Sequence, residues 1–287
     1  MIPLLYLSNV LCASGQSALG KLSGRLRGSN AHFNLAKAAA ALLLFALWAS
    51  LRFTFHLPTL LYGALYGIFS TASAVAGLAA LTTGPMALAS VIVSFSLVLP
   101  CLFGILFLGE TLSLFGGIGL FLLAASILLL KRRSSGQLTG RWWVLVFVTL
   151  VSNGICSILQ KLHQRAFPKL FQVEFMLWAT AVVFLYLAGM TLFNAVRPQN
   201  SKAVQGGAPL RIPLLLGVGS GILNGGANYL SLSLAALENA VILYPVQSAL
   251  TALASFLVGR FLFREKVTRL QLLGLSLGVA AVVLLKI

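Results

Sequence analysis

One short polar motif occurs twice in this sequence, 144 residues apart: Ser8-Asn9-x-x-Cys12-x-x-x-Gln16 and Ser152-Asn153-x-x-Cys156-x-x-x-Gln160. Asn9 and Gln16 are separated by two helical turns and share one helix face, and Asn153 and Gln160 repeat this spacing. An amide inside a membrane is costly unless it is paired. These four residues are therefore candidate substrate-binding residues, and hydrogen bonding between helices is an alternative that amides suit equally.

Glu174 is a further candidate, because it lies a few residues inside an apolar run. By pattern it aligns with His32, and Lys37 lies about one turn deeper than His32. An intramembrane cation usually has a partner, so we expect Lys37 to pair with Glu174. Alternatively, the Glu174 carboxylate only interacts favourably with the dipole at the start of its own helix, or it pairs with Lys161 or Lys169.

Asn224 and Asn228 lie at i and i+4 on one helix face, which could line a cavity, and Tyr229 is beside them. The same run carries glycines at the spacing that permits close helix packing: Gly217, Gly221 and Gly225. Tyr244 is a candidate ligand contact in the next run, where Pro245 either frees a backbone carbonyl or only kinks the helix.

The remaining charged groups have structural interpretations. We expect Glu110 and Glu265 to cap the helices that follow them, and Lys21 and Lys161 to extend from helix ends toward the membrane surface. Glu238 lies in a tight turn between two apolar runs and is a weaker candidate for function.

Nothing predicts an enzyme, a metal site or a cofactor. Histidines occur at positions 32, 56 and 163, in different runs, and no H-x-x-x-H motif is present. Cys12 and Cys156 suit a role as small apolar fillers better than a disulfide or a metal pair. A phosphate-binding G-x-x-x-x-G-K-[ST] loop is also absent, so direct use of ATP is not expected.

The elements that carry these residues are membrane helices. The chain has 287 residues, of which 59% are hydrophobic and 8% charged, which excludes a water-soluble fold. One span needs about 20 apolar residues. The apolar runs predict an all-α polytopic membrane protein with ten transmembrane helices, at about 3–20, 32–51, 58–81, 84–107, 112–130, 142–160, 171–194, 211–236, 239–262 and 269–286.

The ten helices divide into two repeats of five. After the motif at offset 144, further matches occur at offset 155: Pro58 with Pro213, Glu110 with Glu265, and Gly119 with Gly274. An odd number of spans per repeat places the second copy upside down. We therefore expect one membrane transporter domain over 1–287, made of repeat one at 1–133, a linker at 134–141 and an inverted repeat two at 142–287.

The positive charges support the inversion and suggest an orientation. The loop after the ninth span carries four cations, Arg260, Arg264, Lys266 and Arg269, whereas the corresponding loop of the first copy has lost them all. Loops after odd-numbered spans hold 14 Lys and Arg, against five after even-numbered spans and in the tail. Because cations concentrate on the cytoplasmic side, both termini are expected to face outward.

The segment Phe107-Leu108-Gly109-Glu110-Thr111-Leu112 with Gly116, Gly117 and Gly119, and its counterpart around Glu265 with Gly274 and Gly278, resembles the end-of-repeat pattern of EamA-like ten-helix members of the drug/metabolite transporter superfamily. The opening Met1-x-Pro3-x-x-Tyr6-Leu7 is similar to the first helix of small multidrug resistance proteins. Those proteins carry a glutamate where this chain has Ser14. The resemblance implies cytoplasmic termini, but the unequal loops favour the outward orientation.

We therefore expect a secondary transporter of a small organic metabolite or drug in a bacterial cell (inner) membrane, working by alternating access. Efflux follows from the resemblance alone. Proton-coupled transport and facilitated transport are both alternatives at this point. The alternative is a lipid or glycolipid-carrier flippase, or an accessory subunit of one. The expected partners are the small-molecule substrate and the lipid bilayer, without nucleic acid; a homodimer is left open.

Overall fold

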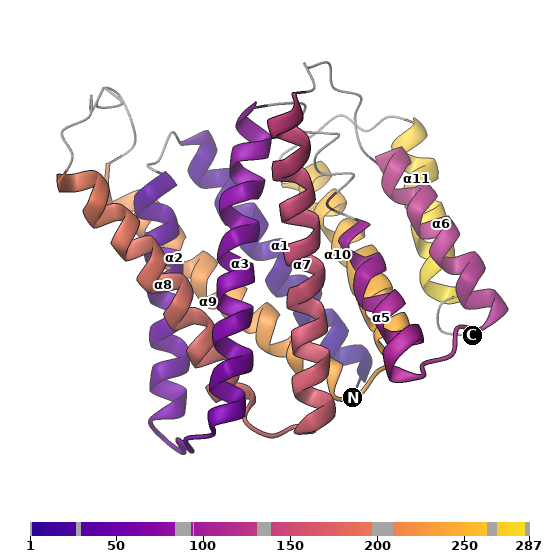
Figure 1. The fold of residues 1–287 in the computed structure, drawn as a ribbon. Coiled ribbons are helices and arrows are strands. Elements are labelled where there is room, and N and C mark those ends of the chain that lie inside the picture. Colours follow the sequence, from indigo (N-terminus) through magenta and orange to yellow (C-terminus); the bar gives the residue numbers. More distant parts are fainter. Residues whose placement is uncertain are drawn as a thin grey trace. The chain divides into compact units, whose positions relative to one another are not determined.

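Helices make up the regular structure of the computed structural model, which describes residues 2–26, 30–83, 93, 95–130, 139–196, 209–262 and 269–284. The helices, shown in Figure 1, are α1 (Ile2–Arg25), α2 (Asn30–Ala49), α3 (Leu57–Thr83), η1 (Phe95–Leu97), α5 (Val98–Leu108), α6 (Leu114–Leu130), α7 (Gly140–Ala166), α8 (Gln172–Val196), α9 (Arg211–Ala235), α10 (Ala240–Phe261) and α11 (Arg269–Leu284).

Each of the ten expected ranges contains a helix, and the all-α membrane class is confirmed. By length and hydropathy, five described helices can cross a membrane: α2, α3, α7, α8 and α10. The segment from η1 to α5, and α6, are shorter apolar helices. The beginning of the expected fourth span, most of the expected linker and Glu265 lie outside the described residues. Ten spans in two inverted repeats therefore stay a prediction.

The chain divides into two compact units, and each unit joins segments from both halves of the sequence. Unit 1 contains residues 3–68 and 169–232, so it holds α1, α2, the start of α3, α8 and most of α9; within it α2 packs against α8. Unit 2 contains residues 69–168 and 233–287. Within unit 2, α6 packs along α11, and α5 packs against α7 and α10.

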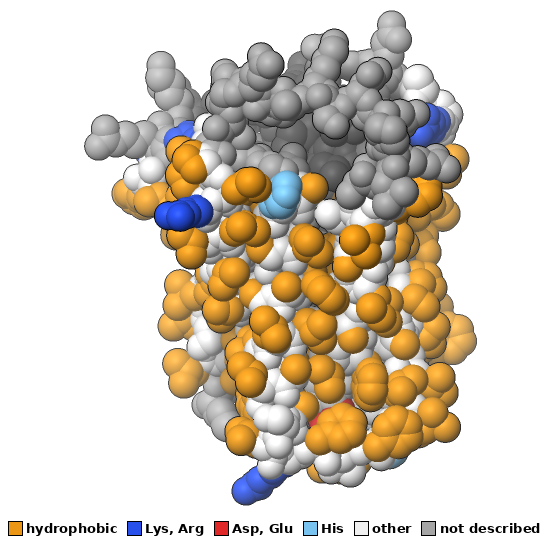
Figure 2. Space-filling model, turned by 90° about the vertical axis from the view of Figure 1, so that its left-hand side faces the viewer, with side chains coloured by type: hydrophobic (Ala, Val, Ile, Leu, Met, Phe, Trp, Pro, Cys, Tyr) orange, Lys and Arg blue, Asp and Glu red, His pale blue; other side chains and the backbone are white. Residues whose placement is uncertain are grey.

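The outer surface of the helices is apolar. Only 22% to 39% of each spanning segment is buried, and large apolar side chains are prominent among the exposed ones. Figure 2 shows hydrophobic side chains covering the middle of one face, with Lys and Arg side chains at both ends. In water such a surface would drive aggregation. It suits a helix surface in contact with lipid acyl chains.

Close packing in unit 1 depends on glycines of α9, as the spacing of Gly217 and Gly221 predicts. A Cβ atom at Gly217 would lie 2.6 Å from the carbonyl oxygen of Phe33 on α2. A Cβ atom at Gly221 would overlap the carbonyl oxygen of Lys37, one turn along α2. The two backbones are therefore in direct contact, which only glycine permits.

Glycines of α3 make the same kind of contact with α8. A Cβ atom at Gly63 would lie 2.7 Å from the carbonyl oxygen of Phe175, and one at Gly67 would lie 2.7 Å from that of Ala179. The two glycine pairs differ by 154 residues, and the α2 and α8 positions that they touch differ by 142. The same contact thus occurs twice in unit 1, made by different halves of the chain.

Candidate functional site

Asn9 and Asn153, the asparagines of the repeated motif, both form hydrogen bonds between helices. In unit 1 the Asn9 amide on α1 is fully buried and donates to the Ala227 carbonyl of α9, at 2.6 Å. In unit 2 the Asn153 side-chain oxygen on α7 accepts a bond of 2.8 Å from the Ser73 hydroxyl of α3. Asn9 and Asn153 differ by 144 residues, and their partners at positions 227 and 73 differ by 154 residues. Hydrogen bonding between helices, the alternative given by the sequence, is therefore present at both asparagines.

The glutamines of the motif lie in different surroundings. The Gln16 side chain is half-buried, and its backbone carbonyl accepts a bond of 3.4 Å from the Ser220 hydroxyl of α9. Gln160 is buried near the end of α7. On the same helix in unit 2, the Ser157 carbonyl accepts a bond of 2.5 Å from the Tyr244 hydroxyl of α10. Tyr244 therefore holds α10 to α7.

Asn224 and Asn228 belong to a polar cluster inside unit 1 that also includes Tyr66. The Asn228 amide nitrogen donates to the Asn224 carbonyl at 3.0 Å, and its side-chain oxygen accepts from the Tyr66 hydroxyl at 3.0 Å. The ring of Tyr66 meets that of Phe175 edge to face, with centroids 5.4 Å apart. Tyr66 is not among the candidates that the sequence suggests, although a tyrosine in the interior of an apolar span is a usable signal.

Glu174 is buried at the start of α8, and its carboxylate accepts a bond of 3.3 Å from the Thr54 backbone amide. Two aromatic contacts hold the loop between α2 and α3 against this end of α8. His56 stacks on Phe171 with centroids 4.3 Å apart, and Phe53 meets Trp178 edge to face. Glu174 thus satisfies a loop amide next to a helix N-terminus, where a negative charge is favourable.

The expected ion pair between Lys37 and Glu174 is wrong, since the structure describes both residues and forms no such pair. Glu174 contacts the loop that follows the end of α2. Lys37 lies 12 residues before Ala49, the last residue of that helix, which corresponds to about 18 Å along the axis. The two side chains are therefore at different levels of unit 1.

Unit 2 contains a buried ion pair between Lys161 and Glu110. The Lys161 Nζ atom lies 3.4 Å from Glu110 Oε1, and the two side chains are 10% and 8% exposed. The interpretation of Lys161 as an anchor at the membrane surface is therefore wrong. A lysine five residues before the end of an apolar helix can either extend outward or pair with a carboxylate, and here the loop after α5 supplies the carboxylate.

Both charges of this pair also bond a helix end. Lys161 Nζ donates to the Ala235 carbonyl at 3.4 Å and to the Glu238 carbonyl at 2.5 Å, at the C-terminus of α9. Glu110 Oε2 accepts from the Val241 amide at 3.1 Å, in the first turn of α10. Glu110 therefore caps α10 and not α6, the next helix in the chain. A cation at a helix C-terminus and an anion at an N-terminus are each favourable.

Groups of three or more potential metal ligands do not occur among the described residues. Cys12, Cys101 and Cys156 are free thiols, and Cys101 and Cys156 are buried. The polar groups of the two units therefore provide amides, hydroxyls and a buried ion pair.

Comparison with known proteins gives a family and a fold. Residues 3–132 match the EamA-like transporter family. No curated protein matches. A solved structure, described only as a crystal structure of a protein, is similar with a TM-score of 0.74 and 17% identity over 99% of this chain and 95% of that chain, and this likeness supports the fold alone. The first half of the chain thus matches EamA-like transporters of the drug/metabolite transporter superfamily, and together with the apolar helices this match indicates a multi-pass membrane protein.

Proposed function

We propose that this protein is a secondary transporter that moves a small organic metabolite or drug by alternating access between two inverted five-helix repeats. The family supports transport in general. The observation that carries the finer proposal is the reciprocal exchange of contacts between the two halves of the chain.

A two-fold relationship between repeats requires that a contact from copy one to copy two occurs again with the partners exchanged. Asn9 of the first half bonds to position 227, and Asn153 of the second half bonds to position 73. Likewise Gly63 meets α8, and Gly217 meets α2. The sequence separation between corresponding positions is 144 residues for α1 and α7, 142 for α2 and α8, and 154 for α3 and α9. These matched contacts support a two-fold relationship between the repeats, which with five spans in each repeat is an inverted one, the architecture of many alternating-access transporters.

Asn224, Asn228 and Tyr66 are the residues that we propose as the principal substrate contacts in unit 1. They lie in the interior turns of α9 and α3 and present amide and phenol groups next to the aromatic ring of Phe175. A solute with both hydrogen-bonding and apolar parts fits this chemistry. Asn9 and Asn153, by contrast, are proposed to hold helices together.

Thermal stabilisation tests this proposal. The purified protein is heated with a panel of metabolites and drugs at two pH values, together with Asn228→Leu and the control Asn34→Leu, which removes an amide from α2 outside the cluster. We expect a solute that stabilises the wild type and the control, but not Asn228→Leu. A solute that stabilises all three proteins equally would contradict the proposed contacts. If only lipids stabilise the protein, the result favours a lipid flippase over a transporter of small solutes.

The direction proposed, on the family resemblance, is efflux. Proton coupling is tested in the same assay by the variant Glu174→Gln. Stabilisation that depends on pH in the wild type and not in Glu174→Gln assigns the proton to this carboxylate. Stabilisation that is independent of pH in both proteins favours a facilitator.

A further inference from the structure

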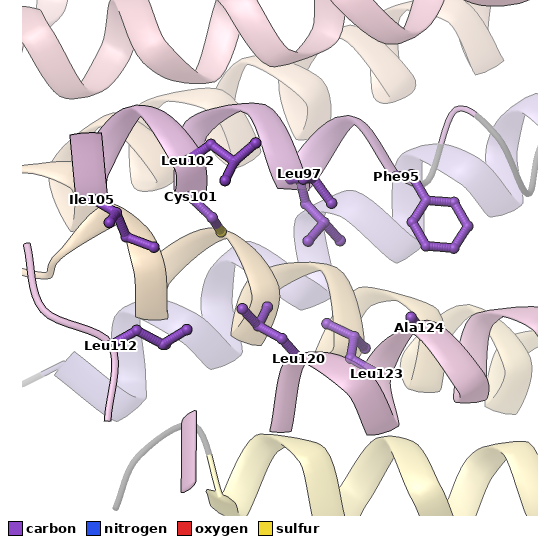
Figure 3. Close-up of a pocket in the computed structure, with 10 residues that line it drawn as sticks. Phe95, Leu97, Cys101, Leu102, Ile105, Leu112, Leu120, Leu123 and Ala124 are labelled. Atoms are coloured by element: carbon purple, nitrogen blue, oxygen red, sulfur yellow. The ribbon is translucent and has the colours of Figure 1, made fainter. Parts of the chain in front are cut away.

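A cavity of about 190 Å³ lies between α5 and α6 in unit 2. The buried side chains of Cys101 and Leu123 form its floor. Its rim is formed by exposed side chains of α5, namely Val98, Leu102 and Ile105. Figure 3 shows side chains of α5 facing those of α6 across the space.

The cavity exists because α5 and α6 each pack against other helices. α6 packs along α11, where the Ser126 hydroxyl donates to the Gly274 carbonyl at 2.6 Å. α5 packs against α7 and α10, and Leu99 fills the space above Gly154 of α7. The side chains between α5 and α6 are all apolar apart from the Cys101 thiol. Such a space does not hold water or a polar solute.

A cation lies near one end of the cavity. Arg165, in the last turn of α7, is exposed and donates a bond of 3.1 Å to the Leu108 carbonyl, at the last residue of α5. Leu108 is three residues beyond Ile105 of the rim, about 5 Å along the helix. The guanidinium is thus positioned where the apolar helices end, the depth at which lipid phosphates lie.

We propose that the cavity between α5 and α6 takes up a segment of an acyl chain of an anionic phospholipid whose phosphate is bound by Arg165. An acyl chain is the only ligand that a membrane supplies at high concentration to an apolar opening on a helix surface. A second copy of the chain is a poorer fit, because a helix about 10 Å wide does not enter a space of this volume. Arginine binds phosphate through two parallel hydrogen bonds.

Fluorescence quenching in vesicles tests the proposal. The protein is reconstituted in phosphatidylcholine containing a small fraction of phosphatidylglycerol with brominated acyl chains, which quench a nearby tryptophan. The quenching of Leu102→Trp beyond that of the wild type reports on the cavity rim, and the same difference for Leu106→Trp, one turn along α5 and 70% exposed, reports on bulk lipid. We expect phosphatidylglycerol to be favoured about fivefold at position 102, and to show no preference at 106. Equal quenching at both positions would overturn the proposal.

Charge variants identify the phosphate contact. In the Leu102→Trp background, Arg165→Gln is expected to abolish the fivefold preference. The control Arg141→Gln, at the opposite end of α7, is expected to keep it, so an equal effect of the two substitutions contradicts a role for Arg165. An independent measurement is the number of phosphatidylglycerol molecules retained in native mass spectrometry, which Ala124→Leu should reduce by filling the cavity. Retention equal to that of the wild type would also overturn the proposal.

Discussion

Lys161 and Glu110 form an ion pair with 3.4 Å between Nζ and Oε1, and the pair bridges the two helix ends at the turn from α9 to α10. The ammonium group faces the carbonyls at the end of α9, and the carboxylate faces the amides at the start of α10. The side chain of Asn239, the N-cap residue of α10, makes no capping bond. Glu110 therefore supplies, from a loop distant in the sequence, the N-terminal capping bond of α10 that the side chain of Asn239 does not make.

Removing both charges of this pair should destabilise the protein by less than the sum of the two single removals. In Lys161→Met the buried Glu110 carboxylate loses its counter-ion, which we expect to cost about 3 kcal/mol of unfolding free energy. Glu110→Gln keeps an acceptor for Val241 but leaves the ammonium without a negative charge. The double variant should recover about 1 to 3 kcal/mol relative to the sum of the single effects.

The measurement is a double-mutant cycle by denaturant titration in detergent. Arg52→Met, which removes an exposed cation, is the control and should change stability by less than about 0.5 kcal/mol. Additive effects of Lys161→Met and Glu110→Gln would show that the pair contributes nothing as a pair.

Alanine at the interhelical glycines should destabilise unit 1. At Gly63 the new methyl group would lie 2.7 Å from the Phe175 carbonyl oxygen and 2.9 Å from Trp178 Cβ, so α3 and α8 must separate. We expect Gly63→Ala and Gly217→Ala each to cost about 1 to 3 kcal/mol.

Gly189→Ala is the matched control for the glycines, because it lies in α8 with no neighbouring atom within 4 Å of the added carbon. Without a clash, replacing a helical glycine by alanine should stabilise by up to about 1 kcal/mol. Melting temperatures in detergent distinguish the expected stabilisation by Gly189→Ala from the expected destabilisation by Gly63→Ala. An equal loss of stability in both variants would contradict the close contact of Gly63 with α8.

Helix positions were predictable from the sequence because long apolar runs leave few alternatives in a membrane. The expected second span, 32–51, and α2 at 30–49 differ by two residues at each end. The register between the third and eighth spans was less accurate. Pro58 and Pro213 differ by 155 residues, whereas the glycines that make equivalent contacts in α3 and α9 differ by 154 residues. Proline is tolerated at slightly different positions within a first turn, so it marks a helix start only approximately.

Pairings between distant residues were not predictable, since periodicity specifies a helix face and not the partner. The expected pair of Lys37 and Glu174 relied on their similar depth in symmetry-related helices. If the repeats are inverted, symmetry-related positions lie on opposite sides of the membrane, so Lys37 and Glu174 are not expected at a similar depth on the same side. The pair of Lys161 and Glu110 was missed because Glu110 follows an apolar run and resembles an ordinary loop residue.

The bond between Asn153 and Ser73 should stabilise unit 2 modestly. Asn153→Ala and Ser73→Ala each remove one side of a bond of 2.8 Å between α7 and α3. Hydrogen bonds between membrane helices contribute about 0.6 kcal/mol on average, so the double-mutant coupling should be of that size. Ser276→Ala, whose hydroxyl bonds only to its own helix, is the control. Zero coupling would assign the two residues to separate roles.

The carboxylate of Glu174 should matter for stability independently of Lys37. Glu174→Gln retains a side-chain oxygen that accepts from the Thr54 amide, so we expect a loss below about 1 kcal/mol; Glu174→Leu removes the acceptor and should cost about 1 to 3 kcal/mol. Because Lys37 lies at another level of unit 1, Lys37→Met and Glu174→Gln should have additive effects in unfolding titrations. A coupling above about 1 kcal/mol between them would restore the ion pair and contradict the arrangement of α2 against α8.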